Sequence, residues 1–318
     1  MQLASGFMTA KHLFAASELG LFEALADSPA SLDALAARTG LTRRAARISA
    51  DAMVALGLLE RQNGIYRNGP AAAAFLADPG PADLRPFLRF WDKISYLAWT
   101  KLAEALASGP PQEIFELNDD LQQVASQGIE AVLAGPANAL PEVFDFSSHK
   151  RLLDVGGGTG SWSIAIARRH RHIEAAVLDL PAVTDLARSR VAATGLQARI
   201  AVITGDAMAS DLPSGYDAFL LANLIHYFSP AQNRDLLARV RRAAGPGSAL
   251  LLADFWTNPA HTEPLHAALM AGEFAVHIRN GDVYSAEEAR QWLEDTGWRF
   301  TGHHQLAGPQ TLISAQAA

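Results

Sequence analysis

The stretch LLDVGGGTGSWSIAIARRHRHIEAAVLDLP, residues 152–181, decides the fold class. Four glycines follow an apolar run that ends near Asp154, and a second apolar run ends near Asp179. A turn with so few side chains lets the backbone approach a ligand more closely than any Cβ would allow. The helix that begins near Ser161 adds free N–H groups and the positive end of a dipole. The stretch therefore predicts a strand, a ligand-binding turn, a helix and a second strand.

The details of the turn indicate the kind of ligand. A dinucleotide-binding turn reads G-x-G-x-x-G, or ends in alanine, whereas this turn reads G-x-G-x-G with Ser161 in the sixth place. Asp154 precedes the turn, where it would accept hydrogen bonds from an ammonium group or brace the turn itself. Asp179 follows the next strand, and its carboxylate suits a ribose diol because it accepts from both hydroxyls. A cationic, phosphate-free nucleoside cofactor fits this chemistry better than a pyrophosphate.

A third acid follows a third apolar run. In ITGDAM, residues 203–208, Asp206 and Met208 come directly after the run. If the three runs are parallel strands, all three acids lie at one edge of the sheet. There Asp206 would bond an adenine amino group and Met208 would cover the ring face.

The second half of the chain has the pattern of a doubly wound α/β domain. Continuous apolar runs, which suit strands covered on both faces, alternate with helices. Ser229 with Gln232 and Ser285 with Glu288 have capping-box spacing and mark the starts of two helices. We expect the domain to span residues 150–318. The apolar runs are residues 151–155, 174–180, 198–204, 216–225, 248–256 and 311–316.

The first half is mostly helical by its apolar periodicity. Residues 31–68 predict a short helix, a turn at Gly40, a longer helix ending near Gly57 and a hairpin across Asn63-Gly64, which is the winged helix-turn-helix order. Such a module reads DNA or serves in packing and dimerisation. DNA binding requires excess positive charge. We favour dimerisation by residues 1–80, joined by a helical connection over residues 81–149, and expect no nucleic-acid partner.

Composition and charge set further limits. Residues 1–80 hold seven Lys/Arg and seven Asp/Glu, and the whole chain has a formal net charge of −7. With no cysteine, the chain has no disulfide, thiolate metal site or cysteine nucleophile. No apolar run approaches the roughly 20 residues that span a bilayer, and the N-terminus lacks a signal-peptide pattern. We therefore expect a cytoplasmic protein with no membrane partner.

Four motifs carry a resemblance to a known family. LLDVGGGTGSWSIAIARRH, AAVLDLPAV, ITGDAM and NLIHYFSPAQNRDLLARVRRAAGPGSALLLADF resemble the successive motifs of class I S-adenosylmethionine-dependent small-molecule methyltransferases of the caffeate and hydroxyindole O-methyltransferase type. The resemblance spans nearly the whole chain. It implies a Rossmann-like domain with a mostly parallel seven-stranded sheet, an N-terminal winged-helix-like dimerisation domain, and a homodimer.

The resemblance also implies S-adenosylmethionine as cofactor and S-adenosylhomocysteine as product. The expected cofactor-binding residues lie in the first three motifs and at the start of the fourth. They are Asp154, Gly156, Gly158, Gly160, Asp179, Leu180, Asp206, Ala207, Met208 and Asn223.

The same resemblance indicates the catalytic residues. His226 stands where the family's O-methyltransferases have the histidine that deprotonates the acceptor hydroxyl. The family's usual triplet is His-Asp-Trp, whereas this chain has His226-Tyr227-Phe228 and lacks the adjacent acid. Asp254 lies near the family's base-orienting acid, although it would also suit a cap of the next segment. We expect O-methylation of a small aromatic or keto-acid metabolite, with His226 as general base.

Two segments are expected to line the acceptor pocket. Residues 261–281 resemble the family's substrate-covering helices; in one helix His266, Met270, Glu273 and His277 share a face. The alternative is an exposed polar stripe beside a core stripe of Leu265 and Leu269. Aromatic residues over 87–99 are first read as core, with a minority lining the pocket. The predicted pocket residues are Trp91, Trp99, Met270, Phe274 and His277.

Three other hypotheses remain open from the sequence. Metal-assisted C-methylation of an α-keto acid would use a divalent ion on His226 and His277, with Asp254 or Glu273 nearby, although we expect no metal. A transcription regulator would use the winged-helix module, whose second helix carries Arg43, Arg44 and Arg47. A third hypothesis is a protein that binds the cofactor and catalyses a different reaction.

Overall fold

The computed structural model describes residues 3–80 and 82–318. Its contacts divide the chain into two compact units, and each is described by itself. The first comprises Met1–Thr100 with Phe115–Ala134, and the second comprises Lys101–Ile114 with Gly135–Ala318. No helix in the described ranges is long and apolar enough to cross a membrane.

The first unit contains the predicted winged-helix arrangement. Helix α2 (Leu32–Thr39) ends at Gly40, which has a φ of 69° and caps the helix in the left-handed conformation. Helix α3 (Arg43–Ala55) follows, and strands β2 (Leu59–Gln62) and β3 (Ile65–Asn68) form the hairpin. A short strand β1 (Ala30–Ser31) pairs with β3, giving the order β1-β3-β2. The helix-turn-helix and hairpin prediction is confirmed.

Two of the three arginines of α3, Arg43 and Arg47, pair with acids of the same unit. The Arg43 guanidinium lies 2.7 Å from the Asp33 carboxylate, and the Arg47 guanidinium lies 3.3 Å from that of Asp51. These pairs balance the positive charge of the helix locally, as the charge count indicates. The remaining elements that lie wholly or partly in the first unit are α1 (Gly6–Glu18), η1 (Glu23–Leu25), α4 (Pro70–Phe75), α5 (Arg85–Phe90), η2 (Trp91–Ser95), α6 (Tyr96–Trp99), η3 (Ile114–Glu116) and α8 (Asp119–Val143). Both η3 and α8 include residues of the second unit.

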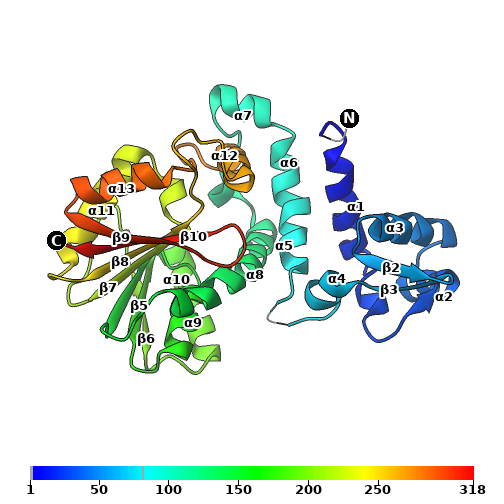
Figure 1. Ribbon diagram of the computed structural model, residues 1–318, viewed down its shortest axis with the longest axis horizontal. Coiled ribbons are helices and arrows are strands. Elements are labelled where there is room, and N and C mark those ends of the chain that lie inside the picture. Colours follow the sequence, from blue (N-terminus) through cyan, green and yellow to red (C-terminus); the bar gives the residue numbers. More distant parts are fainter. Residues whose placement is uncertain (1–2, 81) are drawn as a thin grey trace. The chain divides into compact units, whose positions relative to one another are not determined.

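A seven-stranded sheet forms the centre of the second unit (Figure 1). Its order is β6-β5-β4-β7-β8-β10-β9; β4 to β8 run parallel, and β10 is antiparallel to both β8 and β9. The predicted mostly parallel α/β sheet is confirmed. The strands are β4 (Arg151–Val155), β5 (Glu174–Asp179), β6 (Ile200–Thr204), β7 (Ala218–Ala222), β8 (Ala249–Asp254), β9 (Trp298–Gln305) and β10 (Thr311–Ala317).

Helices contact the sheet and one another around it. Helices α9 (Ser161–Arg169) and α10 (Pro181–Ala193) pack on β5 and β6, while α11 (Pro230–Ala243) and α13 (Ala286–Asp295) pack together. Both predicted capping boxes are present, at Ser229 and Ser285. Helix α12 (Leu265–His277) packs against α7 (Leu102–Ser108), and the short turn η4 (Ile225–Tyr227) follows β7.

Strand β9 was absent from the sequence-based set of apolar runs. Its sequence WRFTGHHQ is polar at most positions, and only Trp298 is buried. It is the terminal strand in the sheet order, so it needs no continuous apolar run. The hydrophobic pattern, which identified the other six strands of the sheet, therefore missed it.

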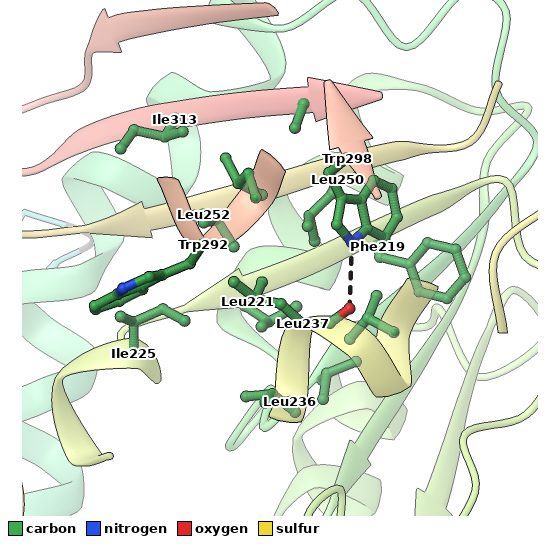
Figure 2. Packing of buried hydrophobic residues seen from close by; sticks show 14 of the residues in the cluster. Phe219, Leu221, Ile225, Leu236, Leu237, Leu250, Leu252, Trp292, Trp298 and Ile313 are labelled. Atoms are coloured by element: carbon green, nitrogen blue, oxygen red, sulfur yellow. Dashed lines mark hydrogen bonds between the residues drawn. The ribbon is translucent and has the colours of Figure 1, made fainter. Parts of the chain in front are cut away.

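The main core of the second unit lies between the sheet and helices α11 and α13. Figure 2 shows Phe219 and Leu221 of β7 and Leu250 and Leu252 of β8 packed with side chains from these helices. The indole of Trp298 donates a hydrogen bond of 3.2 Å to the carbonyl oxygen of Leu237. This bond ties the terminal strand β9 to α11 and gives the buried indole N–H the acceptor that such a group usually has.

Replacing Trp298 tests this anchoring. We expect Trp298→Ala to lower the free energy of unfolding by about 3–5 kcal/mol, because it leaves a cavity in a closely packed core. Trp298→Phe keeps most of the ring and is expected to cost less. Urea unfolding followed by circular dichroism measures both. Leu106→Ala, at a side chain that is 69% exposed, is the control and is expected to change stability by about 0.5 kcal/mol or less. Equal stability of Trp298→Ala and wild type would contradict the role of Trp298 in anchoring β9 to α11.

Candidate active site

The glycine-rich turn between β4 and α9 leaves its backbone accessible. Gly156, Gly158 and Gly160 have φ values of 66°, 58° and 83°, in the left-handed region that favours glycine. A Cβ at Gly156 would lie 2.8 Å from the Leu224 side chain, whereas one at Gly158 would point into open space. The turn therefore needs glycine for both conformation and clearance, and it is open on the side of Gly158.

Asp154 braces this turn from beneath. Its side chain is fully buried, and its Oδ2 accepts a hydrogen bond of 2.7 Å from the Ser163 hydroxyl of α9. Burial raises the pKa of the Asp154 carboxyl to about 7, and the charge of Asp179 adds to this, against the lowering effect of Ser163. Of the two alternatives from sequence, bracing is the contact observed. Ser163 is not predictable from the sequence, because its spacing from Asp154 matches no recognisable motif.

Asp179, at the end of β5, lies directly beside the turn. Its Oδ2 accepts a hydrogen bond of 2.7 Å from the Gly158 N–H, and its Oδ1 accepts one of 2.7 Å from the Leu180 N–H. Each carboxylate oxygen keeps a lone pair for a further donor. The carboxylate is therefore held at the carboxyl edge of the sheet, next to the exposed backbone of Gly158.

Beyond β6 a cavity of about 240 Å³ adjoins the third predicted acid. Its lining includes Asp206 and the apolar side chains of Ile203 and Leu212. Asp206 is exposed and its Oδ1 accepts a hydrogen bond of 2.8 Å from the Met208 N–H. Met208 and Ala207 are partly buried against the main core. This segment thus places a carboxylate and apolar groups together, next to the strand that carries Asp179.

A buried histidine–aspartate pair lies at the ends of β7 and β8. His226, on η4, is 6% exposed, and its Nδ1 lies 2.8 Å from Oδ1 of Asp254, which is 1% exposed. A carboxylate only accepts, so Nδ1 carries a proton, and in the neutral imidazole Nε2 is then the nitrogen with the lone pair. Asp254 Oδ1 also accepts from the Phe255 N–H at 2.9 Å. Asp254 therefore makes both contacts considered from the sequence: it orients the histidine, and it caps the segment that begins at Phe255.

Aromatic rings enclose this histidine. The Phe274 ring from α12 stacks on the His226 imidazole, with centroids 3.9 Å apart and planes 5° from parallel. The Tyr227 ring centroid lies 4.6 Å from that of His226. Burial, reinforced by the charges of Asp254 and Asp179, raises the pKa of the Tyr227 phenol to about 12, so the phenol stays neutral at physiological pH.

Helix α12 forms as predicted, but its exposed and buried faces differ from the alternative considered from sequence. Leu265 and Leu269 are 72% and 54% exposed, so a core stripe of these leucines is wrong. Glu273 and His277 are buried, with the His277 Nε2 3.2 Å from the Glu273 carboxylate, so an exposed polar stripe is wrong as well. The helix packs through the face that carries Met270, Glu273 and His277, and its apolar residues there, Ala267, Met270, Phe274 and Ile278, form a cluster with Tyr227 and Phe255.

The remaining predicted residues divide between the two units. Asn223, with a φ of 52°, directly follows β7, and its side-chain oxygen accepts a hydrogen bond from Gln310. Its Nδ2 is buried with no hydrogen-bond partner among the described residues. Trp91 and Trp99 belong to the first unit, so their place against the catalytic edge stays a prediction.

No finding favours the metal-assisted alternative. Within residues 3–80 and 82–318, no three His, Asp or Glu side chains form a group that would hold a metal ion. The two histidines of that hypothesis instead belong to separate pairs, His226 with Asp254 and His277 with Glu273.

Comparison with known proteins identifies the family. Residues 99–299 match the O-methyltransferase domain, and residues 1–78 match the O-methyltransferase dimerisation domain. The chain therefore belongs to the S-adenosylmethionine-dependent O-methyltransferases. It is an enzyme that transfers a methyl group from S-adenosylmethionine to a hydroxyl of a small molecule. The module at residues 1–78 is thus a dimerisation domain, and nothing favours a transcription regulator.

Individual proteins that are similar to the chain support this family assignment. The chain is 34% identical over 315 residues to 3-hydroxy-5-methyl-1-naphthoate 3-O-methyltransferase of Streptomyces sahachiroi, covering 96% of this chain and 91% of the relative. It is 30% identical over 321 residues to the tetracenomycin polyketide synthesis 8-O-methyl transferase TcmO of Streptomyces glaucescens, covering 98% and 94%. A solved structure of PigF with SAH is 28% identical, with a TM-score of 0.84 and coverage of 99% and 98%.

The raised pKa of Asp154 predicts a pH-dependent stability. An unfolded aspartate has a pKa of about 3.9, so between that value and about 7 the folded state binds more protons than the unfolded state. The stability contributed by the protonated carboxyl is therefore present at low pH and is lost as pH rises towards 7. We expect the wild type to lose stability relative to Asp154→Asn by about 1.4 kcal/mol per pH unit in this interval.

Urea unfolding of the apoprotein from pH 5 to 8 measures this difference. Asp185→Asn is the control, because that side chain is 92% exposed and its removal is expected to leave the pH profile unchanged. A constant free-energy difference between wild type and Asp154→Asn across the series would show that Asp154 is ionised throughout.

Proposed function

We propose that this enzyme O-methylates a hydroxyl on a fused-ring aromatic metabolite, with His226 as general base and Asp254 as its positioning residue. The observation that carries the proposal is the buried 2.8 Å pair between His226 Nδ1 and Asp254 Oδ1, at the same sheet edge as the glycine-rich turn. S-adenosylmethionine supplies an electrophilic methyl group bonded to a sulfonium.

The residues at the turn fit a nucleoside cofactor that carries an amino acid. The open side of Gly158 gives a ligand access to the backbone, and the carboxylate of Asp179 lies beside it with lone pairs for ribose hydroxyls. Asp206 borders the cavity beyond β6, where it would accept from an adenine amino group, with Met208 at the ring face. Asn223 offers a buried amide with no partner among the described residues. The proposed cofactor set also includes Asp154, Gly156, Gly160, Leu180 and Ala207.

The proton-transfer step follows from the arrangement of the pair. The Nδ1–H of His226 donates to Asp254, which fixes the ring orientation and leaves Nε2 to accept the proton of the acceptor hydroxyl. The negative charge of the Asp254 carboxylate then stabilises the imidazolium that forms on His226. The stacked Phe274 ring and the neutral Tyr227 phenol exclude water from the same region.

The acceptor class follows from the enclosing side chains and the relatives. Flat aromatic acceptors suit the apolar surface made by Phe274, Phe255 and Met270 around the base. The Streptomyces sahachiroi relative is named for methylating the 3-hydroxyl of a naphthoate, and TcmO for a tetracenomycin polyketide. We include Trp91, Trp99 and His277 in the acceptor pocket.

The assembly and location complete the proposal. We propose a homodimer formed through residues 1–80, supported by the dimerisation-domain match at residues 1–78. Residues 81–149 form the helical connection to the pocket, and residues 150–318 the catalytic domain. The cytoplasmic location and the expected absence of nucleic-acid and membrane partners stay predictions.

Replacing the base tests the catalytic assignment. We expect His226→Ala to lower turnover by about 100-fold or more, since general-base catalysis contributes about that factor. Its affinity for S-adenosylhomocysteine, measured by calorimetry, is expected to stay near that of the wild type. Turnover is measured as radiolabelled methyl transfer to 3-hydroxy-5-methyl-1-naphthoate and related hydroxylated aromatic acids. Wild-type turnover in His226→Ala would rule out His226 as the base.

Replacing Asp179 tests the cofactor site. Asp179→Asn keeps the side-chain volume but removes the charge, so charge-assisted bonds to the ribose are weakened. We expect the affinity for S-adenosylhomocysteine to fall by about 10- to 100-fold, equivalent to about 1.5–3 kcal/mol. Calorimetry measures this, with Asp185→Asn as a control on the exposed face of α10. Unchanged affinity would place the ribose elsewhere.

A further inference from the structure

The backbone around His226 is fixed by hydrogen bonds from two other segments. The Asn233 side chain of α11 donates to the carbonyl oxygens of Ile225 and Phe228, at 3.0 and 3.1 Å. From the segment after α12, the Asp282 N–H donates to the His226 carbonyl at 3.1 Å. The Tyr284 hydroxyl donates to the Phe228 carbonyl at 2.6 Å. The turn that carries the base is therefore held from both sides.

Gly281 makes the closest approach to this turn. A Cβ built on Gly281 would lie 2.2 Å from the carbonyl oxygen of His226 and 3.0 Å from the Ile278 side chain. Gly281 is absent from the residues with positive φ, so space, rather than backbone conformation, requires glycine here. The clashing atom belongs to the backbone and has no rotamer by which to move away. Any larger residue at 281 must displace either the loop or the His226 peptide.

We infer that Gly281 is a positioning residue for the catalytic base, acting together with Phe274. Phe274 lies against the face of the His226 ring, at a centroid distance of 3.9 Å, while Gly281 and Asp282 lie against its backbone carbonyl. Residues 274–282 thus contact the base at both ends, and Asp254 fixes the ring nitrogen between them. This inference rests on the proposed role of His226.

The energetic consequence follows from the geometry of proton transfer. A methyl group at 281 must separate from the His226 carbonyl oxygen from a 2.2 Å approach to an ordinary contact, so the loop and the His226 peptide move apart by about 1 Å in total. A displacement of about 1 Å at a reacting group costs on the order of 100-fold in rate. The cofactor-binding residues at the ends of β4 and β5 lie on other strands, so cofactor affinity is expected to persist.

The variant Gly281→Ala tests the inference, with Gly245→Ala as the matched control. A Cβ at Gly245 has only the Ser248 hydroxyl near it, at 3.9 Å, and Gly245 belongs to the same unit. We expect Gly281→Ala to lower kcat towards 3-hydroxy-5-methyl-1-naphthoate by about 30- to 100-fold. The Kd for S-adenosylhomocysteine is expected to change by less than about threefold, and Gly245→Ala to match the wild type in both measurements.

A spectroscopic readout separates positioning from a general structural role and needs no acceptor. In the enzyme loaded with S-adenosylhomocysteine, the imidazole nitrogen and Nδ1–H signals of His226 are assigned by their loss in His226→Ala. We expect Gly281→Ala to shift these signals and Gly245→Ala to leave them in place. Wild-type His226 signals and wild-type kcat in Gly281→Ala would overturn the inference.

The experiments distinguish a failure of the proposed role of His226 as the base from a failure of the proposed role of Gly281 in positioning it. A fully active His226→Ala would remove the proposed base, whereas the His226 signals in Gly281→Ala would still report whether residue 281 positions the ring. If Gly281→Ala does not fold, the variant Phe274→Leu tests the inference instead, because it removes the stacked ring and keeps an apolar side chain. Unshifted His226 signals in a folded Phe274→Leu would overturn the inference.

Discussion

Parallel pairing of adjacent strands is the constraint on which the catalytic site depends. Because β4 pairs with β5 and β7, and β7 with β8, all in the parallel sense, their carboxyl ends meet at one edge. The residues that leave those ends are the glycine-rich turn, Asp179, His226 and Asp254. None of these groups is near another in sequence. Their convergence is a property of the sheet, and the apolar core shown in Figure 2 keeps the sheet in that arrangement.

Specific hydrogen bonds hold the carboxylates buried at this edge through one oxygen each, while the second oxygens of Asp154 and Asp254 have no partner among the described residues. An unpaired buried charge is strongly unfavourable, whereas a paired and hydrogen-bonded one is tolerated. Asp254 accepts from His226 and from the Phe255 N–H, and Asp154 accepts from Ser163. The same contacts that make burial tolerable also fix the orientation of the groups. The Nδ1–H of His226 is directed to Asp254, and this leaves Nε2 as the acceptor.

Much of the architecture was predictable from sequence, for physical reasons. Interior strands β4, β5, β7, β8 and β10 have continuous apolar runs because both of their faces are covered, and the terminal strand β6 has an apolar run that is only partly buried. The capping boxes at Ser229 and Ser285 are local signals, and both are confirmed. Strand β9 was missed because an edge strand tolerates polar residues. The exposure of Leu265 and Leu269 was mispredicted because periodicity shows that two faces differ without showing which one packs.

The site was predictable in its strand-end residues and less so in its supporting contacts. Asp179 and the glycines follow from strand order and turn chemistry. The contact of Phe274 with His226, and of Gly281 with the His226 carbonyl, joins segments about 50 residues apart in sequence. No spacing rule connects such segments. These contacts depend on how α12 and the loop after it return to the sheet edge, which is a tertiary property.

The most direct test of the central claim is a crystal structure with S-adenosylhomocysteine and 3-hydroxy-5-methyl-1-naphthoate bound together. We predict that the ribose hydroxyls bind the Asp179 carboxylate and that the acceptor oxygen lies within about 2.6–3.2 Å of His226 Nε2. An acceptor oxygen bonded to a different side chain, with His226 Nε2 directed away from it, would contradict the account.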